Sequence, residues 1–210
     1  QMCIRDRIKL EEKQAAAAVG QGKLVQLWAH YLEQHNITAA QILLAPDDTE
    51  TRRRHLNARA TMKTLLSLGV VPIVNENDTV TTYEIRFGDN DRLAARVAGM
   101  ISADLLILLS DIDGLYNSDP SLDSNAKHIE EVSEITENIL ALGGSANASF
   151  ASGGMATKLA AGQIATNAGA DMIICDGRYE QPVKRLLDGA RASLFHSSIE
   201  PHTAREKWIA

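Results

Sequence analysis

Residues Leu105–Tyr116 read LLILLSDIDGLY, five apolar residues followed at once by a polar turn. A short run of unbroken apolarity, rather than alternation, is typical of a strand that is covered on both faces of its sheet. Ligands of parallel sheets bind beyond the carboxyl ends of the strands. We therefore predict a buried strand at Leu105–Leu109 and a binding segment directly after it, at Ser110–Tyr116.

Three similar apolar runs lie elsewhere in the chain, and a fourth lies near its end. They are Gln41–Ala45 (QILLA), Val70–Val74 (VVPIV), Met172–Cys175 (MIIC) and Ala192–His196 (ASLFH). The segments between the strands show helical spacing of apolar residues and are Glu11–Val19, Lys23–Gln34, Thr51–Leu68, Asp91–Met100, Ser133–Leu142, Thr157–Ala168 and Gln181–Leu187. Strands that alternate with helices are joined by crossover connections. This order predicts an α/β fold with a mainly parallel sheet and helices on both faces.

The composition narrows the possible functions. The chain has 210 residues, of which 45% are hydrophobic and 23% charged, as in an ordinary globular protein. A net charge of −6 and an aromatic content of 4% argue against a nucleic-acid surface. No apolar run approaches the roughly 20 residues of a membrane span, and two cysteines make no disulfide framework. We predict a single cytoplasmic domain over residues 1–210, with neither nucleic acid nor membrane as a partner.

A glycine-rich loop, Ser152–Lys158 (SGGMATK), leads into one of the predicted helices. Its two glycines allow backbone amides to approach an anion closely, and the helix that opens at Thr157 offers its positive end. Lys158 then lies in the first helical turn, which is a poor place for a cation unless an anion is also present. Either the loop binds phosphate, or it is a flexible glycine loop with a solvated lysine.

Two polar clusters lie next to predicted helices and strands: Asn75–Asp78 (NEND) follows a strand, and Gly88–Asp91 (GDND) opens a helix. Asp89 or Asn90 is a good N-cap, but capping explains one such residue and not two clusters. A small zwitterionic ligand suits both clusters, because a carboxylate binds its ammonium group and side-chain amides bind its carboxylate.

Other signatures are weaker or missing. Asp111 and Asp113 either hold Mg²⁺ or form an Asx-turn before Gly114, and the turn is the simpler interpretation. The six histidines have no metal-ligand spacing, so we assign no metal-ligating residue. The chain contains neither G-x-x-x-x-G-K-[ST] nor G-x-G-x-x-G, the two common nucleotide-binding signatures.

Taken together and in order, several segments resemble the amino-acid kinase family, and within it the bacterial members that phosphorylate glutamate. They are KQAAAAVGQ (Lys13–Gln21), HLNAR (His55–Arg59), VPIVNENDTV (Val71–Val80), FGDNDRLAA (Phe87–Ala95), LLSDIDGLYNSDP (Leu108–Pro120) and SGGMATK. The resemblance runs from about Lys13 to Trp208 and implies a three-layer αβα sandwich around a mainly parallel sheet. The S/T-D-x-x-G-L-Y segment is shared across the family, whereas NEND, GDND and GGM-x-TK point to glutamate as the acceptor.

The resemblance also implies roles for individual residues. Asp78 and Asn90 would bind L-glutamate, with Asn75 nearby. Asp91 would orient the catalytic cations, and Lys158 would neutralise the phosphoryl group in transfer. The residues implied to contact ATP are Ser110, Asp111, Ser152, Gly153, Gly154, Met155, Ala156, Thr157 and Lys158. Two of these depart from the usual pattern, since Ser110 replaces a threonine and Ala156 replaces a serine.

The reaction implied is transfer of a phosphoryl group from ATP, with Mg²⁺, to the side-chain carboxylate of L-glutamate. The product, L-glutamyl 5-phosphate, is the first intermediate of proline biosynthesis, with proline as feedback inhibitor and a homodimer or homotetramer as the assembly. The alternatives are another kinase of the family, acting on aspartate or acetylglutamate, and a non-catalytic fragment that binds an amino acid or a nucleotide.

The resemblance begins downstream of two features that the family carries near its N-terminus. One is a first strand with a glycine-containing phosphate loop and a lysine, and the other is a glycine-rich turn with a serine that helps to hold glutamate. Many bacterial members also continue into an RNA-binding-like PUA domain. We therefore expect an N-terminally truncated kinase domain, with poor or no activity by itself.

Overall fold

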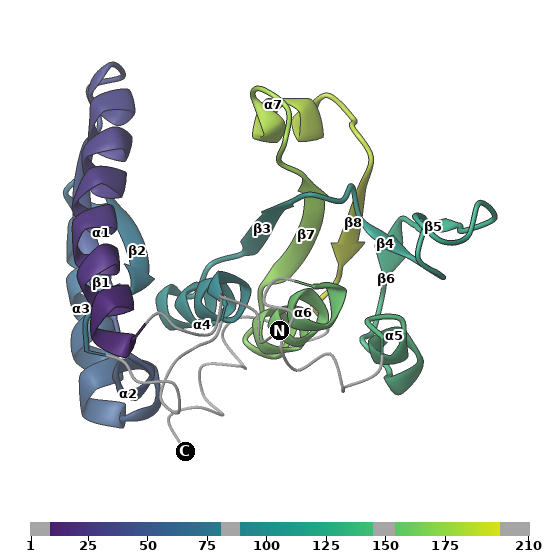
Figure 1. Ribbon diagram of the computed structural model, residues 1–210, viewed down its shortest axis with the longest axis horizontal. Helices are drawn as coiled ribbons and strands as arrows, with labels where there is room; N and C mark the ends of the chain where they lie inside the picture. Colours follow the sequence, from purple (N-terminus) through teal and green to yellow (C-terminus); the bar gives the residue numbers. More distant parts are fainter. Residues whose placement is uncertain (1–8, 81–88, 145–153, 198–210) are drawn as a thin grey trace. The chain divides into compact units, whose positions relative to one another are not determined.

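The computed structural model describes residues 9–80, 89–144 and 154–197, in two compact units, Gln1–Phe87 and Gly88–Ala210 (Figure 1). No helix in these three described stretches is long and apolar enough to cross a membrane. The prediction of one kinase domain over residues 1–210 stays a prediction. Each unit is described by itself.

The first unit is built on two parallel strands, β1 (Thr38–Leu44) and β2 (Val70–Glu76). Their register runs from Thr38 opposite Val70 to Leu44 opposite Glu76. Parallel neighbours need a crossover, which the helices α2 (Pro46–Glu50) and α3 (Arg52–Ser67) supply. Gly69 follows α3 with φ 74°, the left-handed conformation that glycine adopts without strain and that often ends a helix.

The helix α1 (Leu10–Glu33) is continuous where the sequence suggested two separate helical segments. Gly20 and Gly22 lie inside it, and a Cβ at either position would meet nothing within 4 Å. The two glycines therefore weaken the helix without breaking it, at about 1 kcal/mol each relative to alanine.

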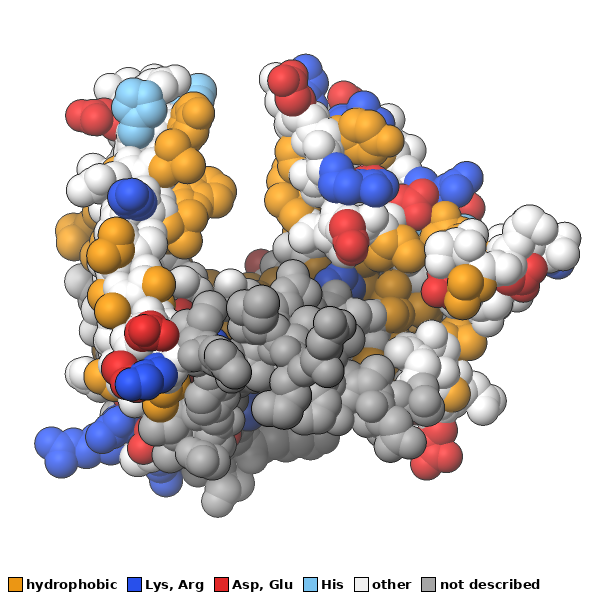
Figure 2. All heavy atoms as spheres, in the orientation of Figure 1, with side chains coloured by type: hydrophobic (Ala, Val, Ile, Leu, Met, Phe, Trp, Pro, Cys, Tyr) orange, Lys and Arg blue, Asp and Glu red, His pale blue; other side chains and the backbone are white. Residues whose placement is uncertain are grey.

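The apolar stripe of α1 points away from its packed face. Leu24, Leu27, Trp28 and Tyr31 are exposed, and hydrophobic side chains gather along this helix in Figure 2. The face that packs against β1 instead carries Ala17, Gln21, Val25, Ala29 and Leu32, spaced three or four residues apart. The side chain of Gln21 is the one that is buried.

The second unit contains a four-stranded sheet in the order β3 (Leu105–Ser110), β7 (Asp171–Asp176), β8 (Ala192–Phe195), β6 (Glu131–Val132). β3 and β7 are parallel, β8 is antiparallel to β7, and β6 is parallel to β8. The core contains Leu108, Leu115, Leu159, Met172, Ile174 and Phe195. The predicted α/β class with a mainly parallel sheet is confirmed.

Helices α4 (Asn90–Ile101) and α6 (Met155–Asn167) pack against each other and against β3 and β7, respectively. Their contact is made of small residues, with Ala95, Ala161 and Ala165 fully buried. A Cβ at Gly99 would lie 2.8 Å from the Cβ of Ala168, so the two helices approach each other too closely for any side chain there.

The segment between β3 and α6 is more structured than the sequence indicated. β4 (Leu115–Tyr116) and β5 (His128–Ile129) form an antiparallel pair. The predicted helix Ser133–Leu142 is shorter, because the side chain of Thr136 caps its start by accepting a hydrogen bond from the Ile139 N–H. The resulting helix, α5, spans Glu137–Ala141. A seventh helix, α7 (Pro182–Leu187), connects β7 to β8.

Candidate active site

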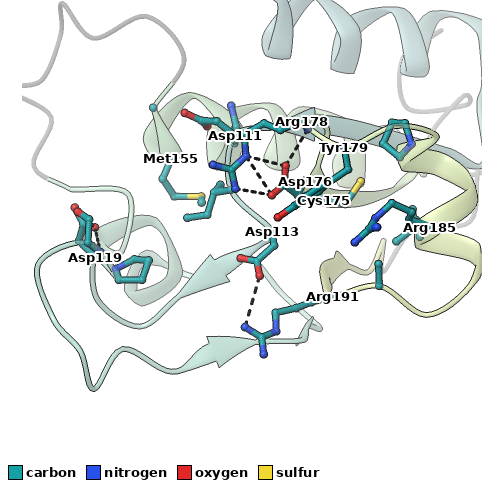
Figure 3. Close-up of a pocket in the computed structure, with 18 residues that line it drawn as sticks. Asp111, Asp113, Asp119, Met155, Cys175, Asp176, Arg178, Tyr179, Arg185 and Arg191 are labelled. Carbon is teal, nitrogen blue, oxygen red and sulfur yellow. Dashed lines mark hydrogen bonds and ion pairs between the residues drawn. The ribbon is translucent and has the colours of Figure 1, made fainter.

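A pocket of about 720 Å³ lies in the second unit, at the carboxyl ends of β3 and β7 (Figure 3). Its wall comes from five places in the chain: the turn after β3, the loop after β4, the start of α6, the loop after β7, and α7 with the residues before β8. The volume falls within the usual range for small-molecule sites. Of the segment predicted to bind a ligand, Ser110–Tyr116, the residues Asp111, Ile112 and Asp113 line this pocket. That the segment binds a ligand stays a prediction.

Lys158 is the buried cation of the pocket wall. Its side chain is 8% exposed, and its Nζ lies 3.0 Å from Oδ2 of Asp91, so it is not the solvated lysine of the simpler interpretation. Thr157 adds a second contact, since its hydroxyl lies 3.3 Å from the same carboxylate oxygen. The anion that stabilises a lysine at a helix N-terminus is therefore the carboxylate of Asp91.

Asp91 is positioned by the capping of α4. The Asp89 carboxylate accepts a hydrogen bond from the Arg92 N–H at 2.9 Å and closes the first turn. Asp91, in that first turn, faces Lys158 in the first turn of α6. The N-cap interpretation of Asp89 is confirmed, and Asn90 lies exposed at the first helical position.

An ion pair between Asp176 and Arg178 follows β7 and forms part of the same wall. The guanidinium of Arg178 holds both carboxylate oxygens in a fork, with the shortest contact at 2.6 Å, and the Arg178 N–H donates to the same carboxylate. These bonds lower the pKa of Asp176 to about 2. The pair is therefore fully charged at neutral pH.

Gly177, between these two residues, is required by close packing. Its N–H donates to the Ser110 carbonyl at 2.7 Å, and a Cβ there would lie 2.8 Å from the Cβ of Leu109. The neighbouring thiol, Cys175, has its pKa raised by burial and then by the charge of Asp176, so it stays protonated and unreactive at neutral pH.

A third charged group on the wall joins Asp113, Tyr116 and Arg191. The Tyr116 hydroxyl donates to Asp113 at 2.9 Å, and Arg191 lies 3.5 Å from the other carboxylate oxygen. On the same wall, the Arg185 guanidinium lies 4.5 Å from the centre of the Tyr179 ring, a cation–π contact. Acidic and basic side chains are interleaved over this end of the unit in Figure 2.

The buried hydroxyl of Ser193 on β8 holds the backbone at Leu115, at the end of the turn that carries Asp113. That oxygen accepts a hydrogen bond from the Leu115 N–H at 2.7 Å and donates to the Ile129 carbonyl. His128 Nε2 lies 3.3 Å from it. Because the hydroxyl has one proton, His128 is the donor in this third contact.

The structure brings some of the predicted site residues together. Asp111, Gly154, Met155 and Lys158 line the pocket, and Ser110, at the end of β3, donates to Asp111 at 3.1 Å. Ala156 and Thr157 are on the same first turn but outside the lining. Ser152 and Gly153 lie outside the described residues. Asn75 and Asp78 belong to the first unit, whereas Asn90 and Asp91 belong to the second.

Several pocket residues were not singled out from the sequence, among them Asp176, Arg178, Tyr179, Arg185 and Arg191. The first three directly follow a predicted strand, so the rule that ligands bind beyond strand ends could have found them. No sequence pattern indicated that Arg185 or Arg191 would line the pocket. Arg185 lies on α7, and Arg191 directly precedes β8.

The pocket wall carries basic and acidic side chains in equal number. Four cationic side chains line it, Lys158, Arg178, Arg185 and Arg191, together with the four carboxylates Asp111, Asp113, Asp119 and Asp176. Among the residues that the structure describes, no three His, Cys, Asp or Glu side chains group closely enough to hold a metal ion. Such a site fits a cation that arrives with phosphate groups and uses one or two carboxylates.

The sequence model of the amino acid kinase family matches residues 4–176, and the chain belongs to this family. The glutamate 5-kinase of Gluconobacter oxydans is 55% identical over 203 residues, which are 97% of this chain and 54% of that protein. The glutamate 5-kinase of Agrobacterium fabrum is 58% identical, covering 97% and 52%. The chain therefore spans about half the length of the curated relatives that it matches.

Solved structures support the fold. A carbamate kinase from Giardia lamblia superposes with a TM-score of 0.59 at 18% identity, covering 88% of this chain and 73% of that one. E. coli aspartokinase III gives a TM-score of 0.58 at 18% identity, covering 93% and 43%. At this level of identity the likeness establishes the fold of the amino acid kinase family and nothing about the acceptor.

Proposed function

We propose that the chain is the kinase domain of an enzyme that transfers the γ-phosphoryl group of ATP to the side-chain carboxylate of L-glutamate. The observation that carries the proposal is the ion pair of Lys158 and Asp91 at the start of two helices, with Lys158 buried on the wall of a pocket that has four cationic side chains. The glutamate 5-kinases that match 97% of the chain support glutamate as the acceptor.

The chemistry suits these residues. A glutamate side chain has a pKa near 4.3, so at neutral pH it is already a nucleophile and needs no general base. In the reaction a carboxylate oxygen forms a bond to the γ-phosphorus, and the bond from that phosphorus to the bridging oxygen breaks. ADP leaves with the electron pair.

The main barrier is electrostatic, because one anion attacks another. In the proposal Lys158 neutralises charge on the transferring group, helped by the backbone amides at the start of α6. Asp91 holds the Lys158 side chain in place through their ion pair. Mg²⁺ bound to the phosphates would supply further charge, with Asp111 or Asp113 as its ligand on the pocket wall.

From the family resemblance we assign binding of the acceptor, glutamate, to Asp78, Asn75 and Asn90. A carboxylate suits the ammonium group of glutamate, and two amides suit its α-carboxylate. Feedback inhibition by proline, a homodimeric or homotetrameric assembly and a cytoplasmic location remain predictions.

A coupled assay of ADP production with different acceptors tests the proposal. L-glutamate should give the highest kcat/KM, ahead of aspartate, acetylglutamate, carbamate and UMP. A preference for another acceptor would move the chain to a different branch of the family. Binding of glutamate and of an ATP analogue without ADP production would favour the non-catalytic alternative.

A further inference from the structure

Gln21 is the one buried residue of the 24-residue helix α1, although it is polar and apolar side chains of the same helix are exposed. It is 7% exposed and lies in the middle of the face that packs against β1. A side-chain amide is costly to bury unless it is hydrogen-bonded. An apolar residue would fill the same position with no such requirement, so the reason for a glutamine lies in the bond that it makes.

That bond goes to the end of β2. Gln21 Nε2 donates to the main-chain carbonyl of Glu76, the last residue of the strand, at 3.0 Å. In the same peptide unit, the N–H of Asn77 donates to the carbonyl of Leu44 on β1 at 2.8 Å. The peptide plane between Glu76 and Asn77 is thus held on both sides, by α1 and by β1.

A peptide plane that is held on both sides cannot rotate about the strand axis, because rotation would break both hydrogen bonds. This matters at the point where β2 ends and the NEND segment leaves the sheet. Asn75 precedes the fixed peptide by one residue, and Asp78 follows it by one residue. The fixed plane therefore restricts the backbone torsions of Glu76 and Asn77, the two residues that lie between Asn75 and Asp78.

We infer that Gln21 is a positioning residue for the acceptor site: it fixes the Glu76–Asn77 peptide so that Asn75 and Asp78 are preorganised for the amino-acid substrate. This inference rests on the proposed function, because Asn75 and Asp78 are assigned to glutamate there. Gln21 itself touches no reactant. It also gives a role to the last residue of the KQAAAAVGQ segment.

The test compares Gln21→Met with Gln26→Met in the full chain. Methionine has nearly the size of glutamine but no N–H donor, so packing is retained and the bond to Glu76 is lost. Gln26 is an exposed glutamine on the same helix and controls for the change of residue type. Hydrogen–deuterium exchange of the peptide 74–80 reports on the Asn77 amide without requiring catalysis.

We expect exchange in this peptide to become at least about fivefold faster in Gln21→Met, as the loss of a buried hydrogen bond of ordinary strength would give, and to stay unchanged in Gln26→Met. Isothermal titration should show glutamate binding weakened by a similar factor, with binding of an ATP analogue within about twofold of the wild type. A purely structural role would not produce this split between the two ligands.

Two results would overturn the inference: unchanged exchange in Gln21→Met, or faster exchange with unchanged glutamate binding. Asp78→Ala, measured in parallel, separates this failure from failure of the proposed function. If Asp78→Ala weakens glutamate binding and Gln21→Met does not, only the positioning role is wrong. If neither variant affects glutamate binding, the acceptor assignment is wrong as well.

Discussion

Lys158 Nζ and Asp91 Oδ2 lie 3.0 Å apart, and each residue stands in the first turn of its own helix, α6 and α4. The N-termini of both helices therefore converge on one ion pair. Two helix N-termini add positive potential at this point, and the carboxylate of Asp91 offsets part of it. The carboxylate of Asp91 thus gives the buried Lys158 side chain a partner of opposite charge.

Lys158→Met should lower kcat by roughly 10²- to 10³-fold, because it removes the buried positive charge proposed to face the transferring phosphoryl group. The measurement is steady-state ADP production in an enzyme with demonstrated glutamate kinase activity. Lys184→Met is the matched control, since Lys184 is exposed on α7 and outside the pocket lining. Turnover within about tenfold of the wild type would show that Lys158 does not have this role.

Asp78→Ala should raise the KM for glutamate by about tenfold or more and leave the KM for ATP nearly unchanged. The reason is loss of the proposed partner of the substrate ammonium group, a charge-assisted hydrogen bond. Asp47→Ala, at an exposed position of the same unit, is the control. Equal effects on both substrates would count against the assignment.

Ser193→Ala should lower the free energy of unfolding by about 1–3 kcal/mol, because it leaves the buried Leu115 N–H and Ile129 carbonyl without the hydroxyl that joins them. Chemical denaturation measures the change. Ser133→Ala, at an exposed position of the same unit, should change it by less than about 0.5 kcal/mol. Similar values for the two variants would contradict the role given to Ser193.

His55 should make stability fall as the pH drops below 6.5. Burial lowers its pKa in the folded protein, so between this lowered value and 6.5 the unfolded chain binds the proton more strongly. Stability is therefore highest above pH 6.5, declines as the pH falls, and levels off below the folded pKa. Thermal unfolding between pH 8 and pH 5 should show a smaller decline in His55→Gln, whereas His35→Gln should behave like the wild type. An unchanged decline in His55→Gln would mean that other groups cause it.

The outer edge of β3 leads to a prediction about the solubility and activity of residues 1–210. Among the residues that the structure describes, β3 pairs only with β7, and Leu105 and Leu109 are about half exposed. We propose that a further parallel strand pairs with this edge and brings a phosphate loop, as the resemblance to the amino-acid kinase family implies. Joining the N-terminal segment of the Gluconobacter oxydans glutamate 5-kinase should raise solubility and ADP production. Comparable activity of residues 1–210 alone would refute this.

The strands of the parallel sheets could be predicted because each is an unbroken apolar run, as in LLILL and MIIC. The two-residue strands β4, β5 and β6 could not, since their pairing depends on contacts between distant segments rather than on local pattern. The sequence also did not indicate that β8 runs antiparallel to β7. The sequence pattern did not indicate which face of α1 packs against β1, since the apolar side chains of Leu24, Leu27 and Trp28 are exposed.

The site was predictable where residues follow a strand or open a helix. Asp111 and Lys158 lie in one pocket as that rule suggested. The ion pair of Lys158 with Asp91 was not predicted, since 67 residues separate the two. Arg185 and Arg191 depend on the path of the chain after β7, which no local pattern specifies.

The close contact of Gly99 with Ala168 has a consequence for the opposite end of the same two helices. Eight residues separate Gly99 from Asp91, about 12 Å along α4 at 1.5 Å per residue. A contact made of backbone and methyl groups has no rotamers that could absorb a displacement. Any atom added at Gly99 would therefore tilt one helix against the other, and the tilt would reach Asp91 and Lys158 as a change of spacing. The absence of a side chain at Gly99 therefore helps to set the distance between Asp91 and Lys158 at the other end of the two helices.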